Sequence, residues 1–214
     1  MIRPRTAADL AACVAALRLV HEQDGYPHRW PADPVDWLST PRLRRAWVAI
    51  ADRSAGAGGG CGCGCDPLRD EVAGHVALNV AGGDRSLALL TEATGLSPER
   101  LAVVSRLFVA VGHRRRGLAQ ALLRHVVADA HQEHLRPVLD VVTADRGAVA
   151  LYEREGWQRI GSVTFHTRYG ESLPGYVYVG PPPPPPCAAP GLPPTGRTGR
   201  DVVGLGGDAC LGRE

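Results

Sequence analysis

The sequence predicts an α/β (α+β) fold, because strand-like apolar stretches alternate with stretches whose apolar residues recur at helical spacing. Two neighbouring segments carry most of this prediction. Residues 101–111 form the longest apolar, β-branched stretch, which is typical of a buried central strand. Residues 118–130 follow, with leucines and valines spaced as on one face of a helix. The chain has 214 residues, enough for one domain with a sizeable core and little more.

Five elements are expected in the N-terminal half. They are strands at residues 2–5, 46–51 and 72–80 and helices at residues 7–21 and 34–39. Thr6 is the expected N-cap of the first helix, because its hydroxyl can accept a hydrogen bond from the first turn. The second and third strands form a predicted hairpin, and its tip at residues 54–66 is rich in glycine and cysteine. We therefore expect a flexible loop at this tip.

The C-terminal half predicts three more strands and one more helix. The strands lie at residues 138–142, 158–165 and 176–179, and the helix lies at residues 147–155. Asp145 is the expected N-cap of this helix and Gly156 its end. Residues 82–100 predict a connector with one helical turn after Pro98. Six consecutive prolines follow Gly180, so we expect a domain over residues 1–180 and a disordered tail rich in Pro, Gly and Arg over residues 181–214.

Composition and charge exclude several classes of protein. The net charge is +2, from 24 basic and 22 acidic residues, so the whole chain lacks the basic excess of a nucleic-acid-binding protein. All the basic residues are arginines, which we attribute to a GC-rich coding sequence. No stretch approaches the ~20 apolar residues of a membrane span. Asp9 and Arg18 interrupt the apolar N-terminal run, and no small-residue cleavage site follows it, so we expect a cytoplasmic protein without a membrane partner.

The cysteines do not predict a metal site. The six of them lie at Cys13, Cys61, Cys63, Cys65, Cys187 and Cys210. A structural zinc site usually contains C-x2-C pairs with two further ligands at a workable spacing, and this pattern is missing. We therefore expect no metal and interpret the CGCGC stretch as part of a low-complexity loop.

The segment from Leu107 to Leu123 carries most of the chemical information. It predicts a strand, then a turn with Gly117 and three arginines, then a helix. A helix N-terminus exposes unpaired N–H groups and partial positive charge, and both favour bound phosphate. Gly117 lets the backbone approach a ligand closely, and the small Ala119 leaves room for a pyrophosphate. Because a Walker A loop and a GxGxxG fingerprint are both absent, the segment predicts a diphosphate site of another kind.

Two motifs in order resemble those of the GNAT acetyltransferase superfamily. Arg114 to Ala119, RRRGLA, resembles its Q/R-x-x-G-x-G/A acetyl-CoA signature. Leu139 to Trp157 resembles the family's strand, short helix with Leu-Tyr, and Gly-aromatic segment. The resemblance covers about residues 1–180 and implies the GNAT fold, a central mixed, mostly antiparallel twisted sheet of roughly six to seven strands flanked by about four helices.

By this resemblance the co-substrate is acetyl-CoA. The turn and the first turn of the helix would hold its pyrophosphate, and the end of the preceding strand would pair with its pantetheine arm. The implied cofactor-binding residues are Val109, Ala110, Val111, Arg114, Arg115, Arg116, Gly117, Leu118, Ala119, Gln120 and Asp145. The family often has proline where Val111 stands and asparagine where Asp145 stands. An aspartate can cap a helix but has no side-chain N–H to donate.

The resemblance also implies N-acetyl transfer to a primary amine, directly within a ternary complex, with Tyr152 as the general acid near the CoA sulfur. No motif identifies the general base. His75, with an unperturbed pKa of ~6.5, is one candidate, and a structural histidine is the other interpretation. Glu22 and Asp24 would either bind a cationic amine or be plain surface charges. A base acting through ordered water would leave no motif at all.

Several alternatives stay open at the level of the sequence. The fold could serve as a catalytically silent acyl-CoA-binding regulatory or interaction module, although the presence of Tyr152 argues against this. It could also transfer a longer acyl chain. The acceptor is expected to be a small-molecule or peptide amine, with no nucleic-acid partner, and a homodimer is open because the family often forms one. Aromatic residues are expected to line the acceptor side, namely Tyr26, Trp30, Trp37, Tyr176 and Tyr178.

Overall fold

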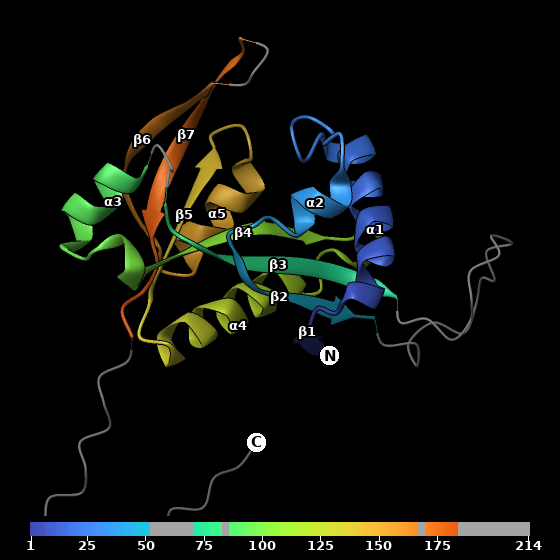
Figure 1. The fold of residues 1–214 in the computed structure, drawn as a ribbon. Coiled ribbons are helices and arrows are strands. Elements are labelled where there is room, and N and C mark those ends of the chain that lie inside the picture. Colours follow the sequence, from blue (N-terminus) through green and yellow to red (C-terminus); the bar gives the residue numbers. More distant parts are fainter. Residues whose placement is uncertain (52–70, 83–85, 167–169, 184–214) are drawn as a thin grey trace, which may run out of the picture. The chain divides into compact units, whose positions relative to one another are not determined.

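The computed structural model describes residues 1–51, 71–82, 86–166 and 170–183. The predicted loop at 54–66, residues 184–214 of the predicted tail and five of the six cysteines lie outside these residues. Within the described residues the chain forms one seven-stranded sheet with the strand order β1-β2-β3-β4-β5-β7-β6 (Figure 1). All strand pairs are antiparallel except β4 and β5. The predicted mixed, mostly antiparallel sheet is therefore confirmed.

The elements have the following bounds. The strands are β1 (Ile2–Pro4), β2 (Leu43–Ile50), β3 (Val72–Val80), β4 (Leu101–Val109), β5 (Arg136–Val142), β6 (Gln158–His166) and β7 (Ser172–Val179). The α-helices of the described residues are α1 (Leu10–Asp24), α2 (Pro34–Leu38), α3 (Leu87–Thr94), α4 (Leu118–Gln132) and α5 (Arg146–Arg154). Short 3-10 turns lie at Ala7–Asp9, Pro98–Arg100 and Val111–His113.

Most of the predicted elements are present, and two differ in an instructive way. A 3-10 turn precedes α1, so the first helix begins three residues later than expected and continues to Asp24, where Gly25 ends it at a φ of 73°. Helix α3 occupies part of the expected connector. This helix is short and carries two threonines, so its local pattern is weak, and its only fully buried side chain is Leu90. Packing against β6 and β7 stabilises it.

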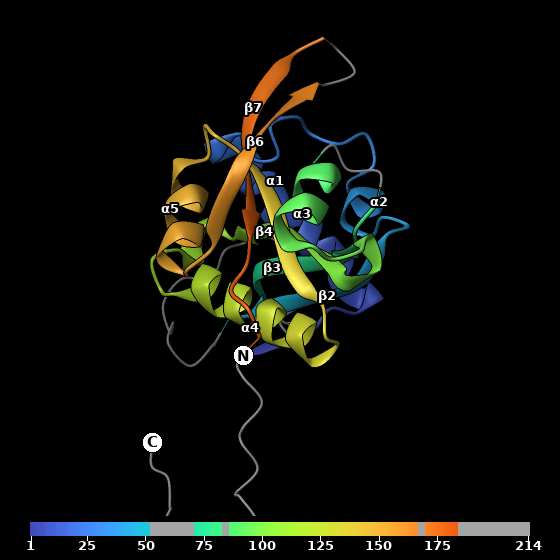
Figure 2. The ribbon, with the colours of Figure 1, turned by 90° about the vertical axis from the view of Figure 1, so that its left-hand side faces the viewer.

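Alternating side chains divide the sheet into two covered faces. Trp47 and Ala49 of β2 pack in the cluster that includes α4 and α5, whereas Val48 packs with α1 and α2 on the other face. Figures 1 and 2 show α4 on one side of the sheet and α1 and α2 on the other. Both faces of the central strands are therefore buried, which explains why β3 and β4 are nearly continuous apolar runs.

Candidate active site

The sheet opens between its two parallel strands. β4 and β5 pair over only three residues, and the last pair joins Val103 to Val138. β5 then pairs with β7 along its other edge, and β4 continues beside β3. Beyond Val103, the edge of β4 that faces β5 has no strand partner among the described residues. Unpaired backbone groups on a strand edge can bind an extended polar ligand.

A bulge in β4 marks the middle of this opening. The register between β3 and β4 shifts between His75 and Ala77, and Arg106 has a φ of 52°, which is uncommon for a residue with a side chain. Two residues of β4 therefore lie opposite a single residue of β3 at this point. Such bulges redirect side chains beside functional sites, and here the bulge turns Arg106 toward Trp37 of α2.

The chain turns from β4 into α4 through the predicted signature segment. Ala110 N–H donates to the carbonyl of Ala73 at 2.9 Å, which ties the end of β4 to β3. Arg115 and Gly117 both have left-handed backbones, with φ of 62° and 76°. Space around Gly117 is open, because a Cβ built there would meet nothing within 4 Å. The positive φ therefore explains the glycine, together with the close approach that a ligand would need.

No side chain caps the N-terminus of α4. The N-cap position is Gly117, which has no side chain, and no described residue accepts a hydrogen bond from the amides of Leu118, Ala119 and Gln120. The α-helical hydrogen bonds start at Ala121, whose N–H donates to Gly117 at 2.9 Å. Fifteen residues of helix add their dipoles behind these amides. The arrangement is suited to an anionic group such as a phosphate.

The three arginines of the turn differ in their surroundings. Arg114 forms an ion pair with Asp24 of α1, and its Nη1 donates to Asp24 Oδ1 at 3.1 Å. Its Nε also donates to the carbonyl of Val109 at 3.4 Å. Arg115 and Arg116 are exposed, and no described residue pairs with either of them. Arg114 thus binds the end of α1 to the turn, and the other two arginines supply the positive charge that faces solvent.

The remaining residues of the predicted cradle support the helix. Leu118 and Ala119 pack against the main core cluster. The side chain of Gln120 donates to Glu155 Oε1 at 2.5 Å, so it is turned toward the end of α5. Its backbone amide is still one of the three unpaired amides described above.

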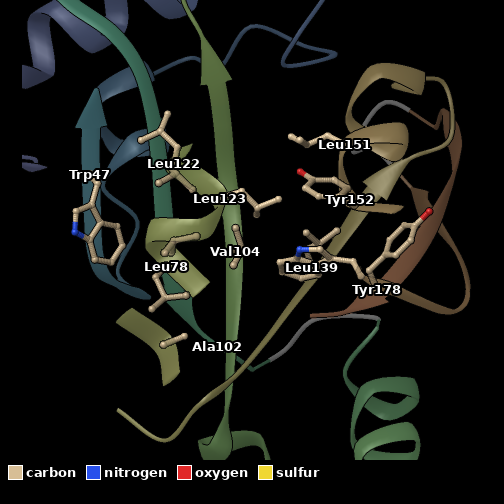
Figure 3. Close-up of a cluster of buried hydrophobic side chains, with 14 of the residues drawn as sticks. Trp47, Leu78, Ala102, Val104, Leu122, Leu123, Leu139, Leu151, Tyr152 and Tyr178 are labelled. Carbon is tan, nitrogen blue, oxygen red and sulfur yellow. The ribbon is translucent and has the colours of Figure 1, made fainter. Parts of the chain in front are cut away.

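Tyr152 lies on α5, on the face of the sheet that α4 covers. Its side chain is only 7% exposed and packs beside Trp157 and Tyr178, with ring centroids 5.8 and 6.0 Å away. Figure 3 shows the Tyr152 hydroxyl directed toward the side where Leu123 and Val104 lie, whereas the Tyr178 hydroxyl points the other way. Burial raises the pKa of Tyr152 well above its ordinary value, and nearby acidic groups add to the rise. The phenol therefore stays protonated at neutral pH.

His75 does not lie in the opening. Its ring is fully buried and stacks on Phe108 with centroids 5.3 Å apart. Nδ1 lies 2.9 Å from the carbonyl of Arg106 and must carry the proton, while Nε2 accepts from Arg5 at 3.1 Å. Burial lowers the pKa of His75 to about 3. Both nitrogens are occupied, so the surroundings fit the alternative interpretation, a structural histidine, and argue against the predicted role of general base.

Asp145 does not cap α5 with its side chain, contrary to expectation. Its carboxylate forms no cap hydrogen bond and lies 3.6 Å from Nε2 of His28, in the segment between α1 and α2. Only its backbone carbonyl serves the helix, accepting from Ala148 and Val149 at 3.0 Å each. Burial raises the pKa of Asp145, and His28 partly offsets this. The carboxylate thus faces another element, because the imidazole of His28 competes there with the helix amides.

The expected aromatic acceptor pocket is only partly assembled. Tyr26 and Trp37 stack edge to face at 6.2 Å, and Trp37 covers the guanidinium of Arg106 at 4.8 Å. Trp30 instead lies against Arg18 on α1. Tyr178 is fully buried and donates to Glu153 Oε1 at 3.1 Å, so it belongs to the opposite face and to the core.

Four polar residues that the sequence patterns did not single out lie at the opening. They are Asn79, Ser105, Arg106 and Asp140, and together they line a cavity of about 410 Å³. Each interrupts an otherwise apolar buried strand, and that interruption is the signal that could have revealed them.

A parallel strand pair that separates early, followed by a helix N-terminus with unpaired amides, suits an extended ligand that ends in phosphates. The turn can hold the phosphates of such a ligand and the unpaired edge of β4 its extended arm, and coenzyme A has both parts. The chain belongs to the acetyltransferase (GNAT) family, whose model matches residues 22–157. It is therefore an acetyltransferase by family. No curated protein matches the chain.

Solved structures agree with this fold. Arabidopsis thaliana NAA60 in complex with a bisubstrate analogue has a TM-score of 0.60 at 22% identity, covering 84% of this chain and 96% of that chain. The same protein in complex with acetyl-CoA has a TM-score of 0.60 at 19% identity, with the same coverage. The ribosomal-protein-S18-alanine N-acetyltransferase from Escherichia coli has a TM-score of 0.57 at 15% identity, covering 88% of this chain and 97% of that chain.

Two absences concern the described residues alone. No described helix is long and apolar enough to cross a membrane. No group of three or more His, Cys, Asp or Glu side chains that could hold a metal ion gathers among the residues whose positions are described.

Proposed function

We propose that this protein is an N-acetyltransferase that moves the acetyl group of acetyl-CoA directly to a primary amine within a ternary complex. The observation that carries the proposal is the continuity of the site. The unpaired edge of β4 leads directly into the uncapped N-terminus of α4, so one extended ligand can bind both. Such a ligand has an arm with amide groups and ends in phosphates, as coenzyme A does.

Each predicted binding residue has a part in this arrangement. Val109, Ala110 and Val111 bring the strand edge up to the turn. The amides of Leu118 to Gln120 receive the pyrophosphate, and Arg115 and Arg116 contribute charge from solvent. Arg114 acts through its pair with Asp24, which fixes the turn against α1. We infer that Asp145 contributes less, because its carboxylate cannot donate a hydrogen bond and pairs with His28.

The transfer forms one bond and breaks another. The neutral amine nitrogen bonds to the thioester carbonyl carbon, the nitrogen loses a proton, and the carbon–sulfur bond breaks to release the CoA thiolate. Tyr152 is the proposed donor of the proton that this thiolate takes up, and solvent then restores the Tyr152 proton. Starting from an ammonium, the net products are the amide, the thiol and one proton released to solvent.

Correct positioning of the two substrates supplies most of the remaining rate enhancement. Effective molarities for well-oriented reactions correspond to about 7–11 kcal/mol, so few catalytic side chains are needed. The surroundings of His75 argue against its use as the base. We infer that the ammonium loses its proton through water, which predicts a rate that rises with pH until the amine is neutral.

The first test is calorimetry of the full chain with acetyl-CoA, with Gly117→Glu as the variant and Gly95→Glu as its control. Both glycines have left-handed backbones, with φ of 76° and 65°, and a Cβ at either meets nothing within 4 Å. Both substitutions therefore impose similar backbone strain. Only Gly117→Glu places a carboxylate at the proposed phosphate site. We expect its affinity for acetyl-CoA to fall about 100-fold or more, while Gly95→Glu retains it.

Equal affinity in the two variants would show that the turn does not hold the phosphates. Thiol release with amine acceptors is then measured on the wild-type chain. Acetyl-CoA binding without thiol release for any amine would identify a silent acyl-CoA-binding module in place of the proposed enzyme.

A further inference from the structure

The bulge in β4 is held by contacts to both the backbone and the side chain of Arg106. Its φ of 52° is unfavourable for a residue with a side chain, and such a backbone persists only where its surroundings fix it. The side chain is held from α2, because its Nε donates to the carbonyl of Trp37 and its guanidinium lies over the Trp37 ring. Nη1 donates to Ser105 Oγ at 2.9 Å. The backbone carbonyl of Arg106 lies 2.9 Å from Nδ1 of His75, so the imidazole contacts the bulge itself.

The His75 ring is fixed as a neutral donor to this carbonyl. Arg5 Nη1 lies 3.1 Å from Nε2, and a guanidinium only donates, so Nε2 accepts and Nδ1 carries the proton. The ring stacks on Phe108 with 18° between the two planes, which sets its orientation. Burial lowers the pKa of His75, and the charges of Arg5 and Arg106 add to this effect. The imidazole therefore stays neutral, and its Nδ1–H points at the bulge.

Arg5 connects this ring to the end of α2. Its Nη1 also donates to the carbonyl of Leu38, the last residue of α2, and its Nη2 donates to Ser39 Oγ, both at 2.9 Å. Leu38 is fully buried, so this end of α2 is well anchored. The same helix supplies the Trp37 carbonyl that holds the Arg106 side chain. A continuous series of hydrogen bonds thus runs from α2 through Arg5 and the ring to the bulge.

The bulge lies on the part of β4 where the transfer is proposed to occur. The unpaired edge of β4 begins beyond Val103 and includes Arg106. Figure 3 shows the hydroxyl of Tyr152, the proposed acid, directed toward the side where Val104 of the same strand lies. A shift of the β4 backbone here would move the thioester relative to the acid and to the amine. A displacement of about 1 Å can lower a rate by about 100-fold.

We propose that His75 is a positioning residue for acetyl transfer, and that its Nδ1–H, with Arg5 behind the ring, holds the Arg106 carbonyl. This contact fixes the β4 backbone along which the thioester arm binds. The inference rests on the proposed N-acetyltransferase function. His75 acts through the backbone of the bulge in this role and touches neither the amine nor the thioester.

Two substitutions separate the donor of the imidazole from its acceptor. The side-chain nitrogen of asparagine can take the place of Nδ1, so His75→Asn keeps a donor for the Arg106 carbonyl. The side-chain oxygen of glutamine can take the place of Nε2, so His75→Gln keeps an acceptor for Arg5. Each variant loses one hydrogen bond and the ring stacked on Phe108. The two are therefore expected to have similar midpoints in urea denaturation.

The assay is thiol release from acetyl-CoA by the full chain, with tyramine, spermidine and a peptide with a free N-terminal alanine as the first amines. We expect kcat to fall by about 100-fold in His75→Gln and to stay within about tenfold of the wild type in His75→Asn. Acetyl-CoA affinity, measured by calorimetry, should change by less than about tenfold in both, because its phosphates bind at the start of α4. His131→Asn is the control, since it removes a histidine contact to the Pro181 carbonyl at the opposite end of α4, and it should leave kcat unchanged.

Nitrogen-15 NMR of the imidazoles tests the geometry on the wild-type chain. The His75 signals are assigned through the bonds to its own backbone. At neutral pH we expect a neutral ring with its proton on Nδ1. A proton on Nε2, or a charged ring, would overturn the proposal whether or not the two variants fold.

The kinetic outcomes separate this inference from the function on which it rests. Wild-type kcat in His75→Gln would overturn the positioning role and leave the acetyltransferase intact. An equal fall in His75→Gln and His75→Asn would also overturn it, because a general base or a purely structural histidine gives that result. No thiol release by the wild-type chain with any amine would overturn the proposed function, and the positioning role with it.

Discussion

Replacing Tyr152 by phenylalanine tests the role of its hydroxyl in catalysis with little effect on folding stability. No described residue hydrogen-bonds to the Tyr152 hydroxyl, and the side chain is 7% exposed, so the variant keeps the packing and breaks no hydrogen bond to a described residue. We therefore expect the free energy of unfolding to change by less than about 1 kcal/mol. Loss of a general acid lowers rates by about 10²–10⁴-fold, which corresponds to about 3–5.5 kcal/mol of transition-state stabilisation.

Tyr178 provides the matched control for this substitution. Its ring is fully buried beside that of Tyr152, but its hydroxyl points away and donates to Glu153 at 3.1 Å (Figure 3). Tyr178→Phe should cost about 1 kcal/mol of stability, because Glu153 is exposed and water competes for that bond. It should leave kcat unchanged.

The assay combines thiol release at saturating acetyl-CoA with urea denaturation of both variants. The Tyr152→Phe variant should bind acetyl-CoA normally and show a lower kcat at every pH below the raised pKa of the phenol. A Tyr152→Phe variant with wild-type kcat would refute the role of general acid. So would a fall in kcat that the Tyr178→Phe variant reproduces, because the effect would then come from packing.

Two further predictions concern stability. The pKa of His75 is lowered to about 3 in the folded chain, so the unfolded chain binds the extra proton between about pH 6.5 and 3. The stability that this group contributes is present above pH 6.5 and falls as the pH drops, by up to about 1.4 kcal/mol per pH unit. When urea denaturation is used to measure the free energy of unfolding from pH 7 to 4.5, this free energy should therefore depend less steeply on pH in His75→Phe than in the wild type. A Cβ at Gly180 would lie 2.8 Å from the Pro137 ring and 3.0 Å from its carbonyl oxygen, so Gly180→Ala should lower the free energy of unfolding by about 1–3 kcal/mol. Gly147→Ala, in open space on α5, should raise it by up to about 1 kcal/mol. Equal thermal midpoints for the two variants would contradict this prediction.

Local patterns predicted the regular elements well. The apolar stretch at residues 72–80 matches β3, and α4 begins at Leu118, directly after Gly117, whose positive φ separates the turn from the helix. These features depend on residues close in sequence, so periodicity and turn chemistry are enough to find them. Helix α3 was missed because its stability comes from contacts with strands more than sixty residues away.

The roles of individual polar side chains were harder to predict. His75 was a candidate base until its partners, Arg5 and Arg106, were known. Asp145 was an expected cap, yet His28 attracts its carboxylate. In each case the deciding partner is distant in sequence, and its distance is set only when the strands and loops pack together.

The sequence by itself predicted the family, which the family model confirms, and it indicated the proposed diphosphate-binding turn and the candidate acid Tyr152, because each depends on a short run of neighbouring residues. The tertiary structure decided which polar side chains share a cavity. Asp140 and Arg106 each interrupt an apolar strand, and they line one cavity because β4 and β5 pair for three residues and then separate. That separation is a property of the whole sheet, since β7 takes the edge of β5 that β4 does not use.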